Sequence, residues 1–126
     1  MAIQVTAHHM SFPVSDLDRS RAFYEGVLGL KAIPRPNFPF PGMWYQAGPC
    51  EVHLIQTPPG ADIGSPPEGN NPMGRHAAFG ISNYAETLAE LKKHGLDVLE
   101  TSPEVGQMWV KDPDGHVIEL IVDRRQ

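Results

Sequence analysis

Apolar and polar residues alternate near the N-terminus, which is the first regular pattern in the chain. Met10, Phe12 and Val14 fall on one side of the predicted strand, and His9 and Ser11 fall on the other. Such alternation is typical of a strand with one buried and one open face. The sequence therefore predicts a half-buried strand whose open face carries a histidine.

A helix is expected after this strand. Ser15 or Asp16 can cap its N-terminus, and Gly29 suits the position that ends a helix. Apolar side chains recur between them at helical spacing, at Leu17, Tyr24, Val27 and Leu28. Three strands complete the predicted first half, at residues 30–33, 43–47 and 51–56.

The same pattern starts again at His76 after a stretch rich in Pro, Gly and Asn. Residues 76–81 alternate as a strand, and Ser82 or Asn83 can cap a second helix that ends at Gly95. Three more strands are predicted, at residues 96–99, 107–111 and 116–122. The last of them follows Asp-Pro-Asp-Gly, a sequence typical of a turn.

The spacing of key residues supports an internal repeat. Gly29 precedes His53 by 24 residues, and Gly95 precedes Glu119 by 24 residues. We therefore predict an α+β fold in which one βαβββ module is written twice. The predicted modules cover residues about 5–57 and 75–123 of a single domain, joined by a linker at 58–74.

Composition narrows the function classes. The chain has 126 residues and a net charge of −5, which argues against nucleic acid as a partner. No apolar run reaches transmembrane length, and the N-terminus lacks the pattern of a signal peptide, so no membrane partner is expected. Cys50 is the single cysteine, which permits no internal disulfide and favours the cytoplasm.

Four polar residues occupy equivalent places in the two modules. His9 and His76 lie on the first strand of each module, and His53 and Glu119 lie on the last. Three imidazoles and a carboxylate that converge could bind a divalent first-row metal ion. A lone strand histidine is more often structural than a ligand, so the repeat is what favours the metal site. His53 could instead contact the substrate or be an edge-strand residue.

Three motifs resemble one known superfamily. They are HMSFPVSDLDRSRAFYEGVLGL at residues 9–30, RHAAFGI at 75–81 and DPDGHVIE at 112–119. They are similar to the glyoxalase, bleomycin-resistance and extradiol dioxygenase proteins, the vicinal oxygen chelate superfamily. The resemblance implies that two modules form a cup-shaped mixed sheet or barrel. It also implies a homodimer in which modules of different chains can pair.

The resemblance further implies the metal ligands and the reaction. The superfamily's ligand positions fall on His9, His53, His76 and Glu119, for a divalent ion such as Ni, Zn, Mn, Co or Fe. The implied activity is that of a lyase or isomerase acting on a small substrate with vicinal oxygens, through an enediolate-like intermediate. Glu119 is the expected general base, and His53 is a second catalytic candidate.

The expected substrate contacts are mostly apolar. Arg35 could meet an anionic group, and the pocket walls are expected to include Phe40, Trp44, Met108 and Trp109, although these side chains could equally be core or loop packing. Ser15-Asp16 stands where glutathione-using relatives have an arginine, which disfavours glutathione as the cosubstrate.

Three alternatives remain open within the same superfamily. The first is an Fe(II)-dependent dioxygenase, with His53 as an acid–base group beside the metal. The second is a thiol transferase such as those that confer fosfomycin resistance. The third is a protein that binds an antibiotic without catalysis. Retention of all four ligand positions argues against the third, because such proteins usually lack the ligands.

Overall fold

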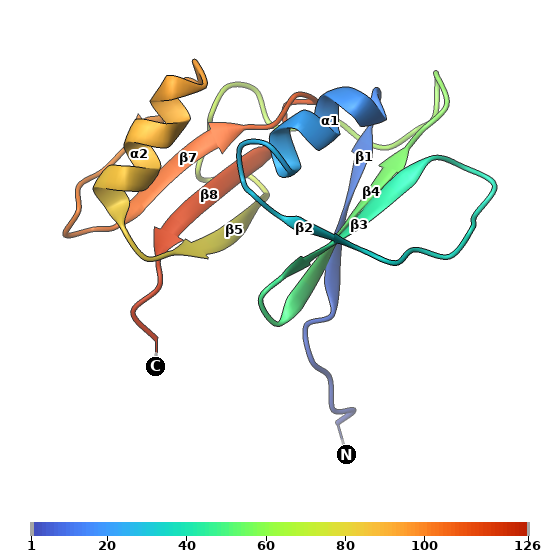
Figure 1. The fold of residues 1–126 in the computed structure, drawn as a ribbon, viewed down its shortest axis with the longest axis horizontal. Coiled ribbons are helices and arrows are strands. Elements are labelled where there is room, and N and C mark those ends of the chain that lie inside the picture. The colour runs from blue at the N-terminus through green and yellow to red at the C-terminus, as the bar shows by residue number, and fades with distance from the viewer. Residues whose placement is uncertain (1, 126) are drawn as a thin grey trace. The chain divides into compact units, whose positions relative to one another are not determined.

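The chain folds into two compact units that have the same order of elements. The structure is a computed structural model that describes residues 2–125. One unit covers Met1–Ala61 and the other covers Asp62–Gln126. Each contains a strand, a helix and three further strands, so the predicted α+β fold with two βαβββ modules is confirmed (Figure 1).

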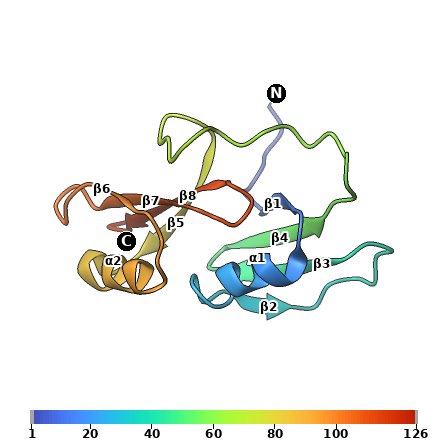
Figure 2. The ribbon, with the colours of Figure 1, turned by 90° about the horizontal axis from the view of Figure 1, so that it is seen from above.

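The first unit is a four-stranded sheet with one helix. Its sheet has the order β1-β4-β3-β2, with β1 parallel to β4 and the other pairs antiparallel. Helix α1 packs against β3 and β4 (Figure 2). The elements are β1 (His9–Val14), α1 (Leu17–Tyr24), β2 (Lys31–Ile33), β3 (Gly42–Ala47) and β4 (Cys50–Gln56).

Helix α1 begins where the sequence predicts and ends earlier. Asp16 is the N-cap, and its side chain accepts a hydrogen bond from the Arg19 amide at 3.2 Å. The expected end at Gly29 is wrong, because the α-helix stops at Tyr24. The amides of Val27 and Leu28 both donate to the carbonyl of Phe23, at 2.9 and 3.0 Å, and this sharing ends the regular helical bonding.

The second unit repeats the arrangement. Its sheet order is β5-β8-β7-β6, with β5 parallel to β8. Asn83 caps α2 through a hydrogen bond from the Glu86 amide at 2.9 Å, and Gly95 follows the helix with φ of 75°. The elements are β5 (His76–Ile81), α2 (Tyr84–Lys93), β6 (Leu99–Glu100), β7 (Gln107–Lys111) and β8 (Val117–Val122).

Strand β6 lies later in the chain than the strand expected at residues 96–99. The amide of Leu96 donates to the carbonyl of Leu91 at 3.2 Å, so the end of α2 uses this group. Only Leu99 and Glu100 pair with β7. The apolar pattern over residues 96–98 therefore reflects the exit from the helix, and only Leu99 of the expected stretch belongs to the strand.

The strand registers of the two units match at the candidate residues. Ser11 is paired with His53 in the parallel β1–β4 ladder, and Ala78 is paired with Glu119 in the β5–β8 ladder. His9 and His76 each lie two residues earlier in β1 and β5, on the same face as these partners. The repeat seen in the sequence is therefore also a repeat of sheet register.

The apolar side chains flanking the candidate residues form the core of each unit. Val52 and Leu54 are fully buried on either side of His53, and Ile118 and Leu120 are buried on either side of Glu119. His53 and Glu119 therefore project from the opposite face of their sheets. Among residues 2–125, no helix is long and apolar enough to cross a membrane.

Candidate functional site

In the first unit, three rings from three adjacent strands form a stack. His53 on β4 lies between His9 on β1 and Trp44 on β3. Its ring centroid is 4.0 Å from that of His9, with an interplanar angle of 16°, and 4.0 Å from that of Trp44, with an angle of 2°. His53 is only 7% exposed. The stack fixes the plane of its imidazole.

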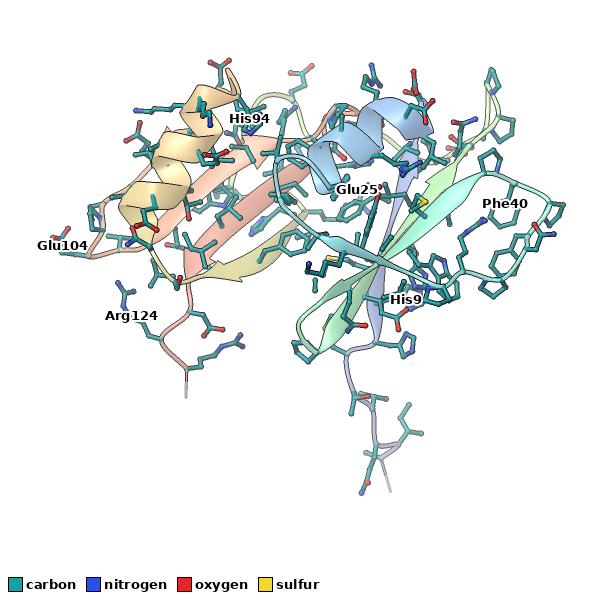
Figure 3. The ribbon with its side chains drawn as sticks, viewed as in Figure 1. His9, Glu25, Phe40, His94, Glu104 and Arg124 are labelled. Carbon is teal, nitrogen blue, oxygen red and sulfur yellow. The ribbon has the colours of Figure 1, made fainter. Side chains whose placement is uncertain are left out.

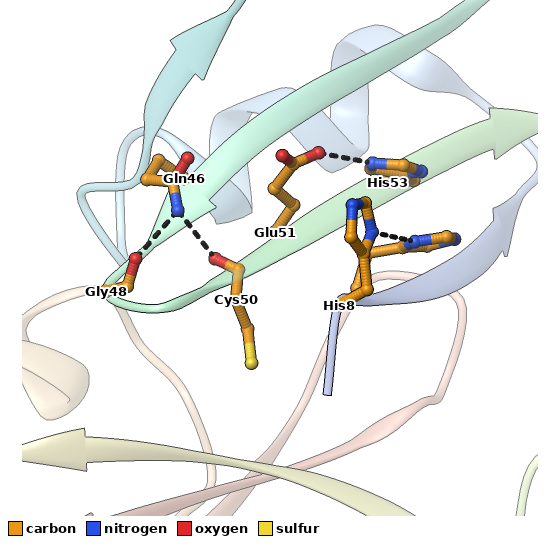
Figure 4. A network of polar contacts seen from close by, with 7 residues as sticks. His8, Gln46, Gly48, Cys50, Glu51 and His53 are labelled. Carbon is orange, nitrogen blue, oxygen red and sulfur yellow. Dashed lines mark hydrogen bonds and ion pairs between the residues drawn. The ribbon is translucent and has the colours of Figure 1, made fainter. Parts of the chain in front are cut away.

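His53 has a charged partner that the sequence reading missed. Nε2 of His53 lies 2.9 Å from Oε1 of Glu51, which is two residues earlier on the same face of β4 (Figure 4). This hydrogen bond from His53 holds the pKa of the Glu51 carboxyl below its usual range. A carboxylate at the i−2 position of the candidate strand was the signal that could have identified it.

His9 lies at the open end of the ring stack. Its Nδ1 is 2.8 Å from Nδ1 of His8, so one of these two atoms donates the hydrogen bond and the other accepts it. The pKa of His9 is lowered, mainly by desolvation and secondly by the nearby His53. A neutral imidazole is favoured, and this is the form that binds metal ions.

In the second unit, Glu119 is a buried carboxylate with two side-chain donors and an imidazole beside it. Nε1 of Trp109 and Nε2 of Gln107 donate to its two oxygens, each at 3.0 Å. Nε2 of His76 lies 2.9 Å from Oε1. Glu119 is 5% exposed, so these partners offset the cost of burying its charge. Gln107 also escaped the sequence reading, although it shares a strand face with Trp109.

The other nitrogen of His76 is held by the backbone. Its Nδ1 lies 2.9 Å from the carbonyl oxygen of Gly74, and a carbonyl can only accept a hydrogen bond. Nδ1 therefore carries a proton, and Nε2 is the nitrogen directed at Glu119. Metal-binding histidines commonly have this arrangement, with one ring nitrogen on a carbonyl and the other on the metal ion.

Arg35, an expected contact for an anion, lies within the loop between β2 and β3. Its guanidinium carbon is 5.1 Å from the ring centroids of both Phe38 and Phe40, and its NH2 group donates to the Phe40 carbonyl at 2.9 Å. The two phenylalanines are each 40% exposed, and Figure 3 shows Phe40 on this loop. Phe38 also contacts Trp44, with ring centroids 6.2 Å apart.

The two expected substrate contacts on β7 face opposite ways. Trp109 shares the face of Glu119, to which it donates its hydrogen bond. Met108 is fully buried and pairs with Leu120 on the apolar face. The structure thus brings Trp109 to the candidate residues and places Met108 in the core.

Each unit contributes two of the four candidate metal ligands. His9 and His53 stack in the first unit, and His76 pairs with Glu119 in the second. Within residues 2–125, no three His, Cys, Asp or Glu side chains gather closely enough to hold a metal ion. Imidazole nitrogens and carboxylate oxygens are donor types that suit a divalent first-row metal ion. The tautomer of His76 fits this role.

Comparison with known families identifies the class of protein. Residues 6–120 match the Glyoxalase/Bleomycin resistance protein/Dioxygenase superfamily, which covers both units. The chain therefore belongs to this superfamily, and the resemblance noted in its three motifs is confirmed.

Individual relatives show two activities within this class. A lactoylglutathione lyase of Salmonella typhimurium is 33% identical, and the match covers 90% of this chain and 89% of the relative. The metallothiol transferase FosB of Lysinibacillus sphaericus is 30% identical over 95% of this chain and 83% of the relative. A glyoxalase family structure from Bacillus anthracis is 28% identical and covers 98% of both chains, with a TM-score of 0.74.

Proposed function

We propose that this protein is a metal-dependent lyase or isomerase of the glyoxalase type. Its substrate would be a small compound with oxygens on adjacent carbons. The observation that carries this proposal is the His76–Glu119 pair, in which Nδ1 of His76 is held by the Gly74 carbonyl and Nε2 faces the carboxylate. With Nδ1 protonated, Nε2 and the carboxylate are the groups of such a pair that would hold a divalent ion.

The proposed ligands are His9, His76 and Glu119, with His53 as the fourth candidate. When bound, a divalent ion such as Ni, Zn, Mn, Co or Fe would act as a Lewis acid toward two adjacent substrate oxygens. The small-molecule substrate and the homodimer both form part of this proposal.

Glu119 and His53 are the proposed catalytic residues. Glu119 can accept a substrate proton on a carboxylate oxygen, and Trp109 and Gln107 hold that carboxylate in place. His53 offers a second acid–base group whose ring plane is fixed by Trp44. Two fixed groups could move a proton between neighbouring carbons while the apolar core of each sheet excludes water from behind them.

The proposed substrate contacts retain the sequence expectations. Trp44 stacks on His53, and Phe40 joins the same group of rings through Phe38. Trp109 lies beside Glu119. Arg35 remains a candidate for an anionic group, although its NH2 group already bonds to Phe40. Met108 is the weakest of these candidates, because it is fully buried on the core side of its strand.

Thiol transfer is the second candidate function. It is favoured by the FosB relative, which is named a metallothiol transferase and matches 95% of this chain. Both candidates need a divalent metal ion and differ in the substrate. The substrates therefore have to be compared directly.

Metal analysis combined with a substrate screen tests the proposal. The purified protein should bind about one equivalent of Ni²⁺ or Mn²⁺ per chain. Equilibrium dialysis and elemental analysis would determine this ratio. It should then convert the adduct of methylglyoxal with glutathione, or with another thiol. Turnover of fosfomycin with a thiol would select the second candidate, and turnover of a catechol with Fe²⁺ would select the dioxygenase. A chain that binds none of these ions would overturn all three.

Size-exclusion chromatography with light scattering tests the dimer. We expect the mass of two chains, about twice 13.9 kDa. A monomer that binds the metal ion with full affinity would show that metal binding does not need a dimer.

A further inference from the structure

We propose that Glu51 is a positioning residue that orients His53 toward the substrate and away from the metal ion. This inference rests on the proposed function. In the proposed arrangement, Glu51 accepts a hydrogen bond from Nε2–H of His53. The lone pair of Nδ1 is then left to accept a hydrogen bond from the substrate. His9, His76 and Glu119 then suffice as the proposed protein ligands.

The ring stack leaves His53 a single rotational freedom. Trp44 and His9 lie against its two faces with ring centroids at 4.0 Å, so the plane of the imidazole cannot tilt without losing both contacts. The ring can still flip by 180° within that plane, which exchanges Nδ1 with Cδ2 and Nε2 with Cε1. Some other group has to select one orientation.

Glu51 is placed to make this selection. Its Oε1 lies 2.9 Å from Nε2 of His53, and its side chain is 24% exposed, so the pair is partly shielded from water. A carboxylate accepts hydrogen bonds only, and an Nε2–H donor is therefore favoured over the other neutral tautomer. Flipping the ring would leave the carboxylate facing a carbon edge and would forfeit the charge-assisted bond.

The two modules differ at the position of Glu51. Glu51 lies two residues before His53, and the corresponding residue two before Glu119 is Val117, which is buried. In the second module, Gln107 and Trp109 hold the last-strand polar group instead. A carboxylate is therefore not required at this position by the βαβββ architecture. The first module has a carboxylate at this position together with the histidine that it contacts, and the second module has neither.

The tautomer of His53 is the first test, and it requires neither metal ion nor substrate. Long-range ¹H–¹⁵N spectra of the imidazoles in the metal-free chain should show the Nε2–H form for His53, with His53→Ala providing the assignment. Glu51→Leu should lose this preference, whereas Glu51→Gln, whose amide oxygen can still accept, should retain part of it. An Nδ1–H form of His53 in the unaltered chain would overturn the inference.

Metal affinity and turnover form the second test. Glu51→Leu should keep the Mn²⁺ affinity within about threefold, since a loss of about 10–100-fold is what disturbing a metal-binding histidine causes. Its kcat on the methylglyoxal–thiol adduct should fall about 10–100-fold with little change in KM, and Glu51→Gln should recover part of that loss. Glu104→Gln, an exposed charge change in the other unit, is the matched control.

The outcomes separate this inference from the proposed function. A fall in Mn²⁺ affinity that parallels the fall in kcat would make His53 a ligand and overturn the inference, as would an unchanged kcat in Glu51→Leu. An unaltered chain that neither binds Mn²⁺ nor acts on any of the tested adducts would instead overturn the proposed function. The tautomer spectra distinguish that failure from the absence of the Glu51–His53 pair.

Discussion

Trp109 and Glu119 lie directly opposite each other on β7 and β8, and the indole Nε1–H donates to Oε1 of the carboxylate at 3.0 Å. Trp44 and His53 have the same register on β3 and β4, but there the rings stack. The repeat therefore keeps a tryptophan beside the last-strand polar group and uses it in two ways. It donates a hydrogen bond to a carboxylate, and it provides a flat surface for an imidazole.

Trp109→Phe should destabilise the fold more than Trp44→Phe. The first change leaves a buried carboxylate without one of its donors, which costs about 1.5–3 kcal/mol for a hydrogen bond to a charged group. The second keeps an aromatic ring against His53. We expect the free energy of unfolding in urea at pH 7 to fall by at least about 1 kcal/mol more for Trp109→Phe. Equal losses would show that the hydrogen bond does not stabilise the fold.

Glu119→Gln should lower metal affinity without unfolding the chain. The amide keeps the size of the side chain and an acceptor at the Oε1 position, which faces both Trp109 and His76. It removes the negative charge and places an NH2 group against the Nε2 donor of Gln107. We expect Mn²⁺ affinity, measured by calorimetry, to fall by more than about tenfold, and turnover to be lost. Glu104→Gln serves again as the control. Full activity in Glu119→Gln would rule out its assignment as ligand and base.

Much of the fold could be predicted because periodicity and caps are local signals. Alternation identified β1 and β5, and the N-caps Asp16 and Asn83 fell within the predicted choices. The errors occurred at element ends. The end of α1 depends on which amides share the Phe23 carbonyl, and the start of β6 depends on pairing with β7. Both are set by contacts that the local sequence does not encode.

The candidate site could be predicted only as far as the repeat reveals it. Equivalent positions identified His53 and Glu119, and strand alternation gave the face on which they lie. The repeat could not identify Glu51 or Gln107, because each occurs in one module and has no counterpart in the other. Hydrogen bonds to a buried polar group depend on side-chain reach across or along strands. Such contacts appear only once the rotamers are known.

Tyr45→Phe should destabilise the first unit in a pH-dependent way. The Tyr45 hydroxyl donates to Glu25 at 2.7 Å, and hydrogen bonds from Arg21 and then Tyr45 lower the pKa of Glu25 below its ordinary value of 4.5. Because the pKa of Glu25 is lowered in the folded state, its ionised carboxylate contributes its full stabilisation above about pH 4.5. That stabilisation is lost as the pH falls through the folded-state pKa of Glu25. We expect a loss of about 1 kcal/mol at pH 7 that shrinks by pH 3.

Tyr84→Phe is the matched control for this pH dependence. The Tyr84 hydroxyl bonds to the Gln107 carbonyl at 3.3 Å and accepts from the Thr101 amide at 3.0 Å, and neither backbone group titrates in this range. The free energy of unfolding that Tyr84→Phe loses should therefore stay nearly constant between pH 7 and pH 3 in urea unfolding experiments. If the two variants have parallel pH profiles, the Glu25 carboxylate is not the group that Tyr45 stabilises.

Asp112→Ala should destabilise the second unit by weakening the turn that leads into β8. Asp112 is 4% exposed, and its Oδ1 accepts hydrogen bonds from the amides of Asp114 at 3.0 Å and His116 at 2.8 Å. Alanine would leave both amides without this acceptor, at a cost of about 2–3 kcal/mol in the free energy of unfolding. Asp112→Asn keeps an oxygen in the same place and should lose less than half as much. Since β8 carries Glu119, Mn²⁺ affinity should follow the same order, with Asp112→Ala weakest. An alanine variant as stable as the asparagine variant would show that the turn forms without these two bonds.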